Sequence, residues 1–436
     1  MNIGVVGLWH LGEIVSTCLA ELGHKVIAYD PNSAVIEKFR RSEPVLAEPG
    51  IVELMAKNKK AGRLSYEIFS PKFAKLHDAF FVTFDTPITK NDSPDTKIVE
   101  KAVAELAKYA KPGLLIVVMS QLPVGTLDKL KQRIKQIRRK DDVRIAYVPE
   151  NLQLGRAIES FMKPARTIIG ADAKAAEEVK KVFQKLPGEK MVMSPASAEM
   201  VKHALNSFLA VSLSFIYNIA DICEAAGADV VAVSRALKSD PRIGAAAYLD
   251  ASLGFSGGTL MRDMRVLESI ARENKITVPV VSGAIHTNAK RLMRAVVILK
   301  KNLGSLKGKE VTVLGLTYKP GTPTLRSSLA ISLMKLLKRQ GMVVSGSDPS
   351  ASCAEVAKLT GSGCDKNPYR AASGSVAVIM ITAWPEYATL DLARLKKTMR
   401  SPFLFIDARN FLASRAGEFE DLGFRYQGVG RGSIDV

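Results

Sequence analysis

The stretch Ile3-Gly-Val-Val-Gly-Leu-Trp-His-Leu-Gly12 decides the fold class of this chain. Ile3 to Val6 has the composition of a short buried strand, and Gly12 to Gly23 has the apolar spacing of an amphipathic helix that ends at a glycine. A second strand-like run, Lys25 to Tyr29, leads directly to Asp30. A strand, a glycine-containing turn, a helix and a second strand in this order predict a parallel βαβ unit.

The same pattern continues along the chain. Strand-like runs alternate with helical stretches as far as residue 196, Ser197 to Ala226 is one long helical stretch, and the alternation restarts at Glu310. We therefore predict an α/β fold with two Rossmann-like doubly wound domains, joined by a long central helix and a small helical domain. The predicted domains are residues 1–196, 197–300 and 301–436.

The composition is that of a soluble globular protein. Of the 436 residues, 47% are hydrophobic and 24% are charged, which excludes wholesale disorder. No apolar run approaches the roughly 18 residues that cross a bilayer, and Met1 to Gly7 lacks the basic start of a signal peptide. The four cysteines show no CxxC spacing and are too few for a disulfide framework. We expect a cytoplasmic protein with no membrane partner.

The net charge is unusual. The chain carries 62 Lys and Arg against 43 Asp and Glu, a formal charge of +19, which favours anionic partners. The basic segment from Lys129 to Lys140 nevertheless has a helical apolar face, so its charges are those of the solvated side of an amphipathic helix. No zinc-finger, RNP or helix-turn-helix pattern accompanies them. We expect an anionic small molecule as ligand and no nucleic acid.

The turn in the first βαβ unit is an incomplete dinucleotide fingerprint. Such a turn needs glycine at its first position, a bare backbone facing the pyrophosphate at its second, and close packing at its third. Gly7 and Gly12 fill the first and third positions, whereas Trp9 stands at the second. Asp30 can accept hydrogen bonds from a ribose 2′-hydroxyl, which favours NAD over NADP. By itself this turn leaves open a βαβ unit that binds no dinucleotide.

Further motifs follow in a fixed order. They are Phe84–Pro87, Met119–Thr126, Val148–Gly155, Ala198–Asn206, Asp240–Gly244, Gly254–Asp263, Tyr318–Arg326 and, at the end, Ile406–Asn410. The series resembles the UDP-glucose/GDP-mannose dehydrogenase family over essentially the whole chain. The resemblance implies NAD-dependent oxidation of the C6 hydroxymethyl group of a nucleotide sugar such as UDP-glucose, within polysaccharide or nucleotide-sugar biosynthesis. It also implies a homodimer around the long helix.

The resemblance assigns roles to individual residues. Lys202 and Asn206 are one helical turn apart, so both can act on one oxygen. Glu150 matches the glutamate that activates water, and Asp263 matches the aspartate that holds it. The cofactor positions implied are Gly7, Trp9, His10, Leu11, Gly12, Asp30, Thr86, Gln121 and Arg326. The substrate positions implied are Leu152, Arg242, Tyr248, Leu249, Phe255, Gly258, Tyr318, Lys319 and Arg409, of which Arg242 would reach the neighbouring subunit. No metal site is expected.

Several of these residues have simpler explanations. Lys202 could be a solvated charge on its helix, Asp263 could support the first turn of the helix after Gly258, and Arg242 could be a turn residue after Pro241.

The chain departs from the family at the nucleophile. Thr259 stands where the family carries its catalytic cysteine, with Met261 and Arg262 in place of a proline and a lysine. An aliphatic hydroxyl ionises far less readily than a thiol, so Thr259 is a poor nucleophile and could instead be a helix N-cap. Other departures, at Trp9, Val35, Gln121 and Leu154, lie at the cofactor.

Two functions therefore remain open. One is an NAD-dependent oxidoreductase that stops at, or passes through, a non-covalent aldehyde. The alternative is a catalytically weak nucleotide-sugar-binding paralogue.

Overall fold

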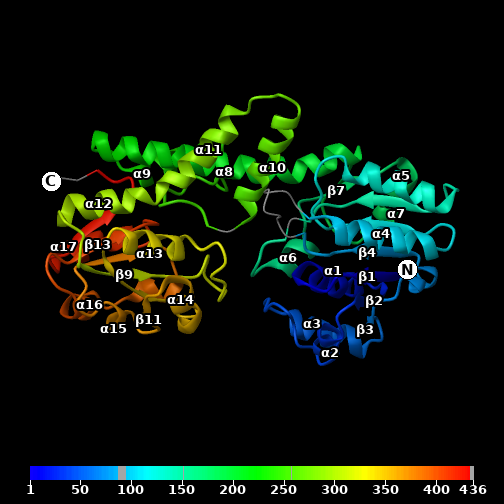
Figure 1. Cartoon of the computed structure of the whole chain (residues 1–436), viewed down its shortest axis with the longest axis horizontal. Coiled ribbons are helices and arrows are strands. Elements are labelled where there is room, and N and C mark those ends of the chain that lie inside the picture. Colours follow the sequence, from blue (N-terminus) through cyan, green and yellow to red (C-terminus); the bar gives the residue numbers. More distant parts are fainter. Residues whose placement is uncertain (87–94, 151, 257, 433–436) are drawn as a thin grey trace. The chain divides into compact units, whose positions relative to one another are not determined.

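The protein is described by a computed structural model covering residues 1–86, 95–150, 152–256 and 258–432 (Figure 1). It divides into two compact units, Met1–Ala204 and Leu205–Val436. Each unit contains one sheet with its own hydrophobic core.

The first unit is built on an eight-stranded sheet in the order β3-β2-β1-β4-β5-β6-β7-β8. The strands are β1 (Asn2–Val6), β2 (Lys25–Asp30), β3 (Leu64–Ile68), β4 (Ala79–Val82), β5 (Leu115–Val118), β6 (Arg144–Tyr147), β7 (Arg166–Gly170) and β8 (Glu189–Met193). All neighbours are parallel except β6 and β7, which meet antiparallel at Tyr147 and Gly170.

Helices cover both faces of this sheet. They are α1 (His10–Glu21), α2 (Ser33–Arg40), α3 (Ile51–Lys60), α4 (Lys97–Tyr109), α5 (Thr126–Arg138), α6 (Ala157–Met162) and α7 (Ala173–Val182), with a 3₁₀ turn at Pro71–Leu76. Every residue of β4 and β5 is buried, because a parallel sheet between two helical layers has no wet face. The chain reverses its direction of winding between β1 and β4, where doubly wound folds bind their ligands.

The second unit repeats this architecture in a smaller sheet. Its six strands run in the order β11-β10-β9-β12-β13-β14, all parallel. They are β9 (Glu310–Leu314), β10 (Val343–Ser347), β11 (Gly363–Asp365), β12 (Ala377–Met380), β13 (Leu404–Asp407) and β14 (Arg425–Gly428). Around the sheet are α13 (Leu329–Arg339), α14 (Cys353–Thr360), α15 (Pro368–Ala371), α16 (Leu392–Thr398) and α17 (Ala416–Asp421), with 3₁₀ turns at Pro385–Thr389 and Ala413–Arg415. The predicted pair of Rossmann-like domains is confirmed.

Helices separate the two sheets along the chain. They are α8 (Pro195–Ala226), α9 (Val230–Ser239), α10 (Thr259–Glu273), α11 (Pro279–Arg291) and α12 (Met293–Leu303). The helix α8 has 32 residues and runs through the boundary between the units. Whether the chain has three domains with the boundaries expected from the sequence remains a prediction.

The helix α8 is an exception to the expectation that no segment could cross a membrane. Of the helices described, it alone is long and apolar enough to do so by length and composition. Its polar residues Lys202, His203 and Asn206 are buried and hydrogen-bonded to protein groups, which favours a helix within a protein core.

The structure also contains a disulfide, where the cysteine pattern predicted no disulfide framework. Cys353 and Cys364 are bonded, with Cα atoms 5.2 Å apart, whereas Cys18 and Cys223 are buried thiols. The two bonded residues lie at the start of α14 and in β11. The pairing depends on the packing of a helix against a neighbouring strand, which the cysteine spacing did not show.

Candidate active site

The turn after β1 requires both of its glycines. Gly7 has φ +99°, and a Cβ atom on it would lie 2.8 Å from the backbone nitrogen of Phe84. A Cβ on Gly12 would come 2.0 Å from the carbonyl oxygen of Gly7. The close approach of α1 to the end of β1 therefore depends on glycine at both positions.

Asp30 lies at the end of β2, beside the same turn. Its carboxylate accepts hydrogen bonds from the backbone nitrogens of Leu8, at 2.8 Å, and Asn32, at 2.8 Å. The side chain is partly exposed, and a carboxylate offers about four lone pairs, so Asp30 retains acceptor capacity for a ribose hydroxyl.

Lys202 and Glu150 meet in the first unit. The Lys202 ammonium donates to the Glu150 carbonyl oxygen at 2.7 Å and to its carboxylate at 3.1 Å. The lysine is 7% exposed, so the alternative of a solvated surface charge is wrong. The second carboxylate oxygen accepts the backbone N–H of Leu152 at 2.7 Å, which fixes the carboxylate toward the lysine.

Asn206 and Asp263 meet in the second unit. The Asn206 side-chain amide donates to the Asp263 carboxylate, and Asp263 is fully buried. The Arg262 guanidinium lies 3.7 Å from the same carboxylate. Asp263 lies beyond the first turn of α10, so the alternative role of supporting that turn is wrong.

Comparison with known families agrees with this geometry. Residues 1–187 match the NAD binding domain of the UDP-glucose/GDP-mannose dehydrogenase family, residues 196–290 its central domain, and residues 312–414 its UDP binding domain. The chain belongs to this family.

Individual dehydrogenases are similar over nearly their full length. The UDP-glucose 6-dehydrogenase of Rhizobium meliloti is 33% identical over 440 residues, covering 99% of this chain and 100% of that protein. The UDP-glucose 6-dehydrogenase TuaD of Bacillus subtilis is 32% identical, covering 99% and 94%. The structure of a UDP-glucose dehydrogenase from Pyrobaculum islandicum superposes with a TM-score of 0.88 at 30% identity, covering 99% and 98%. As a member of the family, the chain is an NAD-dependent nucleotide-sugar dehydrogenase.

The turn after β1 fits the family's cofactor in most respects. Gly7, Gly12 and Asp30 have the required geometry, and no side chain caps the first backbone N–H groups of α1, which can therefore face an anion. Trp9, in place of the family's middle glycine, is the N-cap residue of α1 and is 52% exposed. Its indole therefore lies on the surface of the turn, where the family has no side chain.

Thr259, at the position of the family's cysteine, is the first residue of α10 and is exposed. The N-cap residue is Gly258, so the hypothesis that Thr259 caps the helix is wrong by one position. Its hydroxyl is available at the helix start, but a hydroxyl so placed still lacks the acidity of a thiol.

The structure brings two further cofactor positions together. The Thr86 hydroxyl donates to the Gln121 carbonyl oxygen at 3.1 Å. The segment after Gln121 is fixed by the buried Glu199, whose carboxylate accepts from the backbone nitrogens of Gly125 at 2.6 Å and Leu127 at 2.7 Å. Burial raises the pKa of Glu199. Glu199 was not among the site residues expected from the sequence, although it lies within the motif Ala198–Asn206.

The substrate positions of the second unit differ in exposure. Leu249 and Phe255 are buried, whereas Tyr248 and Gly258 are exposed. The Lys319 ammonium lies 5.8 Å from the centre of the Tyr318 ring.

The arginines among the expected cofactor and substrate positions lie on the surface. Arg409 lines a cavity of about 480 Å³ with residues of α9, and Arg326 lines another of about 720 Å³ with the segment from Ser350 to Cys353. Arg242 forms a two-pronged ion pair with Asp240, at 3.0 and 2.7 Å, and is otherwise solvated. This pairing suits a turn residue, but it also leaves the guanidinium at the surface, where a second subunit could meet it.

Two buried carboxylates beside the turn were not expected from the sequence. Glu48 accepts from His10 Nε2 at 2.9 Å and from the backbone nitrogens of Gly155 and Ala157 at 2.8 and 3.2 Å. Glu13 accepts from the backbone nitrogens of Val45 and Leu46 at 3.2 and 3.4 Å.

Glu13 is fully buried, and burial raises the pKa of its carboxyl to about 7, assisted by the nearby negative charge of Glu48. The sequence did contain a signal for this buried carboxyl, because Glu13 stands in the first helix at a position where the helical pattern calls for an apolar residue.

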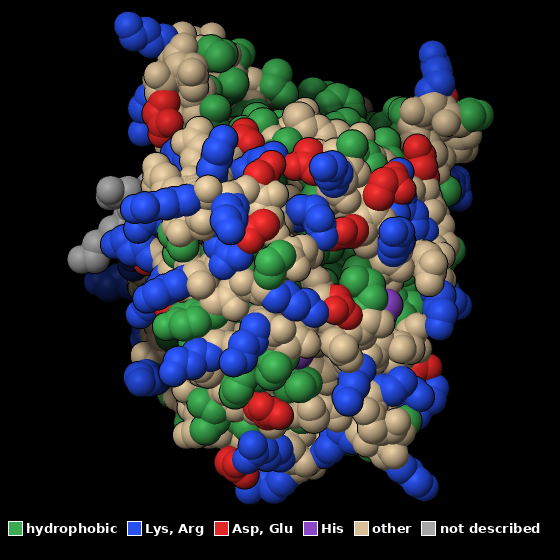
Figure 2. Space-filling model, turned by 90° about the vertical axis from the view of Figure 1, so that its right-hand side faces the viewer, with side chains coloured by type: hydrophobic (Ala, Val, Ile, Leu, Met, Phe, Trp, Pro, Cys, Tyr) green, Lys and Arg blue, Asp and Glu red, His purple; other side chains and the backbone are tan. Residues whose placement is uncertain are grey.

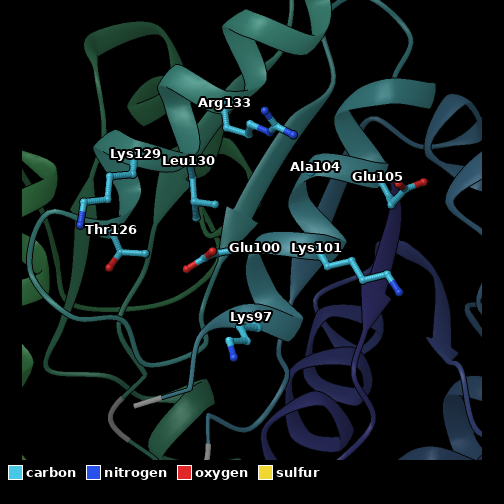
Figure 3. Close-up of a pocket in the computed structure, with 9 residues that line it drawn as sticks. All are labelled: Lys97, Glu100, Lys101, Ala104, Glu105, Thr126, Lys129, Leu130 and Arg133. Atoms are coloured by element: carbon cyan, nitrogen blue, oxygen red, sulfur yellow. The ribbon is translucent and has the colours of Figure 1, made fainter. Parts of the chain in front are cut away.

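The basic helix α5 contributes to a surface groove. A groove of about 520 Å³ is lined by Thr126, Lys129 and Arg133 of α5 and by Lys97, Glu100 and Lys101 of α4 (Figure 3). Lys and Arg are also abundant over the face of the molecule shown in Figure 2. Leu130 and Ile134 are buried, as expected for an amphipathic helix with a solvated basic side. None of the expected site residues lines this groove.

Proposed function

We propose that this chain oxidises the C6 hydroxymethyl group of a UDP-glucose-like nucleotide sugar without a covalent enzyme intermediate. The observation that carries the proposal is the presence of the Lys202–Glu150 pair in the first unit and the Asn206–Asp263 pair in the second, in a chain that lacks the family's cysteine at position 259. A protein that only binds its ligand has no need for either pair. When bound, NAD supplies the acceptor for the hydride that leaves C6.

Lys202 is proposed to stabilise the alkoxide that forms as the C6 hydroxyl passes its proton to a water molecule. Its ammonium is buried, so its charge acts through a medium of lower dielectric constant than water. The two hydrogen bonds to Glu150 hold the ammonium in place, and among the contacts of the described residues its third N–H is left for the substrate oxygen.

Asp263 is proposed to hold the water that takes part in the second half of the reaction. The amide of Asn206 fixes the carboxylate, and Asp263 or Glu150 then removes a proton from water as it adds to the C6 aldehyde. The hydrated aldehyde can lose a second hydride and become the carboxylate. Without Cys at position 259 the aldehyde is never attached to the protein, so it can also leave as the product.

A catalytically weak, nucleotide-sugar-binding paralogue is the second candidate. Trp9 favours it, because an exposed indole occupies the position where the pyrophosphate approaches the backbone. Weak cofactor binding would lower turnover while leaving the second unit able to hold a nucleotide sugar.

The remaining site residues are proposed on the family match. Gly7, Gly12, Asp30, Thr86, Gln121 and Arg326 would hold the cofactor, which we propose is NAD in preference to NADP. Tyr318, Lys319 and Arg409 would hold the uridine-diphosphate portion of the substrate.

The chain is proposed to form a cytoplasmic homodimer through α8. Phe208, Phe215 and Ile222 recur every seven residues, so they form one stripe along the helix, and they are 68%, 50% and 61% exposed. Large apolar side chains exposed in one stripe are typical of a protein interface. Leu213 and Ile216 of the same helix are buried and instead face the core of the unit.

Incubation with NAD and a panel of UDP-, GDP- and dTDP-sugars tests the proposed activity. We expect NADH to appear together with an aldehyde or a carboxylate product, measured by absorbance and product mass in the same reaction. Nucleotide-sugar binding without any NADH would favour the second candidate.

Intact-mass spectrometry tests the absence of a covalent step. The unchanged protein should form no adduct with the sugar, whereas Thr259→Cys should capture the aldehyde. An adduct on the unchanged protein would overturn the non-covalent route.

A further inference from the structure

We propose that Asn288 of α11 is a positioning residue that fixes the loop between Ser252 and Ser256 in the form that binds the nucleotide sugar, with Arg291 supporting it. This inference rests on the proposed function, because the loop carries Phe255 and leads to Gly258.

Side chains of α11 hold the backbone of this loop from one side. Asn288 Oδ1 accepts the backbone N–H of Phe255 at 2.9 Å, and Arg291 Nε donates to the Ser252 carbonyl oxygen at 2.8 Å. The two residues are about one helical turn apart, so one face of α11 meets two points of the loop. A Cβ atom on Gly254, which has φ +123°, would lie 3.0 Å from Asn288 Oδ1. The loop therefore packs directly on α11.

Arg291 is itself held by contacts with α8 and with the loop. It is 2% exposed, forms an ion pair with Asp221 of α8 and lies over the ring of Tyr217, 5.3 Å from its centre. The Tyr217 hydroxyl lies 3.0 Å from Ser252 Oγ, which also contacts the carbonyl oxygen of Gly254 at 2.9 Å. A buried arginine whose charge is balanced by one carboxylate is expensive to move, so it is a stable anchor for a loop.

The far end of the loop is tied to a second predicted substrate segment. Ser256 Oγ accepts the backbone N–H of Leu329, the first residue of α13, at 3.1 Å. The segment that precedes α13 carries Tyr318, Lys319 and Arg326. The loop thus connects the anchor on α11 with the start of α13, and a change at Asn288 should reach the substrate without touching it.

Asn288 is the better residue for a test, because it is only partly buried and its replacement leaves no uncompensated charge. Asn288→Ala removes the acceptor for the Phe255 amide, whereas Asn288→Asp retains a carboxylate acceptor at the same place. Asn302→Ala on α12 is the matched control, since Asn302 bonds only to the carbonyl oxygen of Ile298 in its own helix, at 2.9 Å, among the contacts of the described residues.

The first measurement is amide hydrogen exchange of the loop in the full-length protein without ligands. We expect the amide of Phe255 to exchange roughly tenfold faster in Asn288→Ala, the order of effect of one lost hydrogen bond, and at the original rate in Asn288→Asp and Asn302→Ala. Unchanged exchange in Asn288→Ala would overturn the anchoring of the loop.

The second measurement is calorimetric binding of UDP-glucose and, separately, of NAD. We expect Asn288→Ala to weaken UDP-glucose binding roughly tenfold, by the same loss of one hydrogen bond, and Asn288→Asp to restore it, with NAD affinity unchanged. Faster exchange with unaltered UDP-glucose affinity would overturn the link to substrate. Failure of the unchanged protein to bind any nucleotide sugar would overturn the proposed function itself, and the exchange result alone would then decide whether Asn288 anchors the loop.

Discussion

In both Rossmann-like units, a backbone N–H that follows the first strand donates to an aspartate carboxylate, but the two aspartates have different roles. In the first unit the backbone N–H of Leu8, after Gly7, donates to Asp30 at 2.8 Å; in the second, that of Leu316, after Gly315, donates to Asp348 at 2.7 Å. Asp30 is the last residue of β2 and Asp348 directly follows β10, and each of them precedes a proline. The two units therefore share this hydrogen bond as well as the same type of fold.

What differs is the remaining capacity of the two carboxylates. Asp348 is fully buried and also accepts from Thr317 and from the Trp384 indole, at 3.0 and 2.9 Å. Asp30 is partly exposed and has no such additional donors among the described residues. In the first unit α1 starts directly after the turn, whereas in the second a long segment precedes α13. One aspartate can serve a ligand, and the other stabilises a loop.

The largest effect should come from the helix that runs through both units. Lys202→Ala removes the cation beside the C6 oxygen, so NADH formation should fall by about 10² to 10⁴-fold, the usual contribution of such a group. Lys131→Ala, which removes only a surface ion pair with Asp172, is the control. Steady-state assays at saturating NAD provide the measurement, and undiminished turnover in Lys202→Ala would contradict the role of this lysine.

The two aspartates should respond differently to the same change. Asp348→Asn places an amide group against several backbone and side-chain donors, so the free energy of unfolding should fall by about 2–4 kcal/mol. Asp30→Asn should change it by less than about 1 kcal/mol, because the site is partly solvated. Asp30→Asn should instead weaken the preference for NAD over NADP, as measured by calorimetry. Equal destabilisation in the two variants would contradict the different roles of the two aspartates.

The stability of the first unit should depend on pH through Glu13. Since burial raises the pKa of Glu13 to about 7, the folded state retains a proton that the unfolded state releases at lower pH, so stability is lost as the pH rises toward and through 7. Glu13→Gln should therefore stabilise the protein at pH 8 by on the order of 2 kcal/mol and have little effect at pH 4.5.

Denaturant titrations at the two pH values provide the measurement. Glu37→Gln, which alters an exposed ion pair with Arg40, is the control and should show no such dependence. A stabilisation by Glu13→Gln that is equal at both pH values would mean that the carboxyl does not titrate in this range.

The smallest effect concerns the turn in the first unit. Trp9→Gly removes the exposed indole and should tighten NAD binding roughly tenfold, about the contribution of one additional backbone hydrogen bond to the pyrophosphate. Calorimetry with NAD measures this, and Trp9→Ala should give an intermediate value because it keeps a Cβ atom. Weaker binding by the glycine variant would show that the indole itself contacts the cofactor.

The features that the sequence predicted are those that depend on local patterns. The strand and helix of the first βαβ unit, the geometry of Gly7 and Gly12 and the place of Asp30 follow from short-range spacing, and the structure agrees. The motifs also located Lys202 and Asp263, but the partners of these residues come from distant parts of the chain. A family match indicates which residues belong to the site, whereas their hydrogen-bond partners depend on how the chain packs.

The features that the sequence missed are produced by long-range contacts. The carboxylate of Glu48 joins His10 to the segment at Gly155, and no periodicity links three points so far apart. The start of α10 at Thr259 differs from the expected cap by one residue, which is within the usual uncertainty of helix ends. The antiparallel pairing of β7 with β6 likewise cannot be predicted from the apolar pattern of the strands.

The disulfide has a consequence for how the protein behaves at high concentration. β11 is the outermost strand of its sheet and has only three residues, and Cys364 within it is bonded to the start of α14. An outer strand exposes unpaired backbone groups, on which another chain can assemble into an extended sheet. A short strand held covalently to a neighbouring helix offers little length for such growth. The bond therefore protects this border of the second unit against self-association as well as joining two elements of its fold.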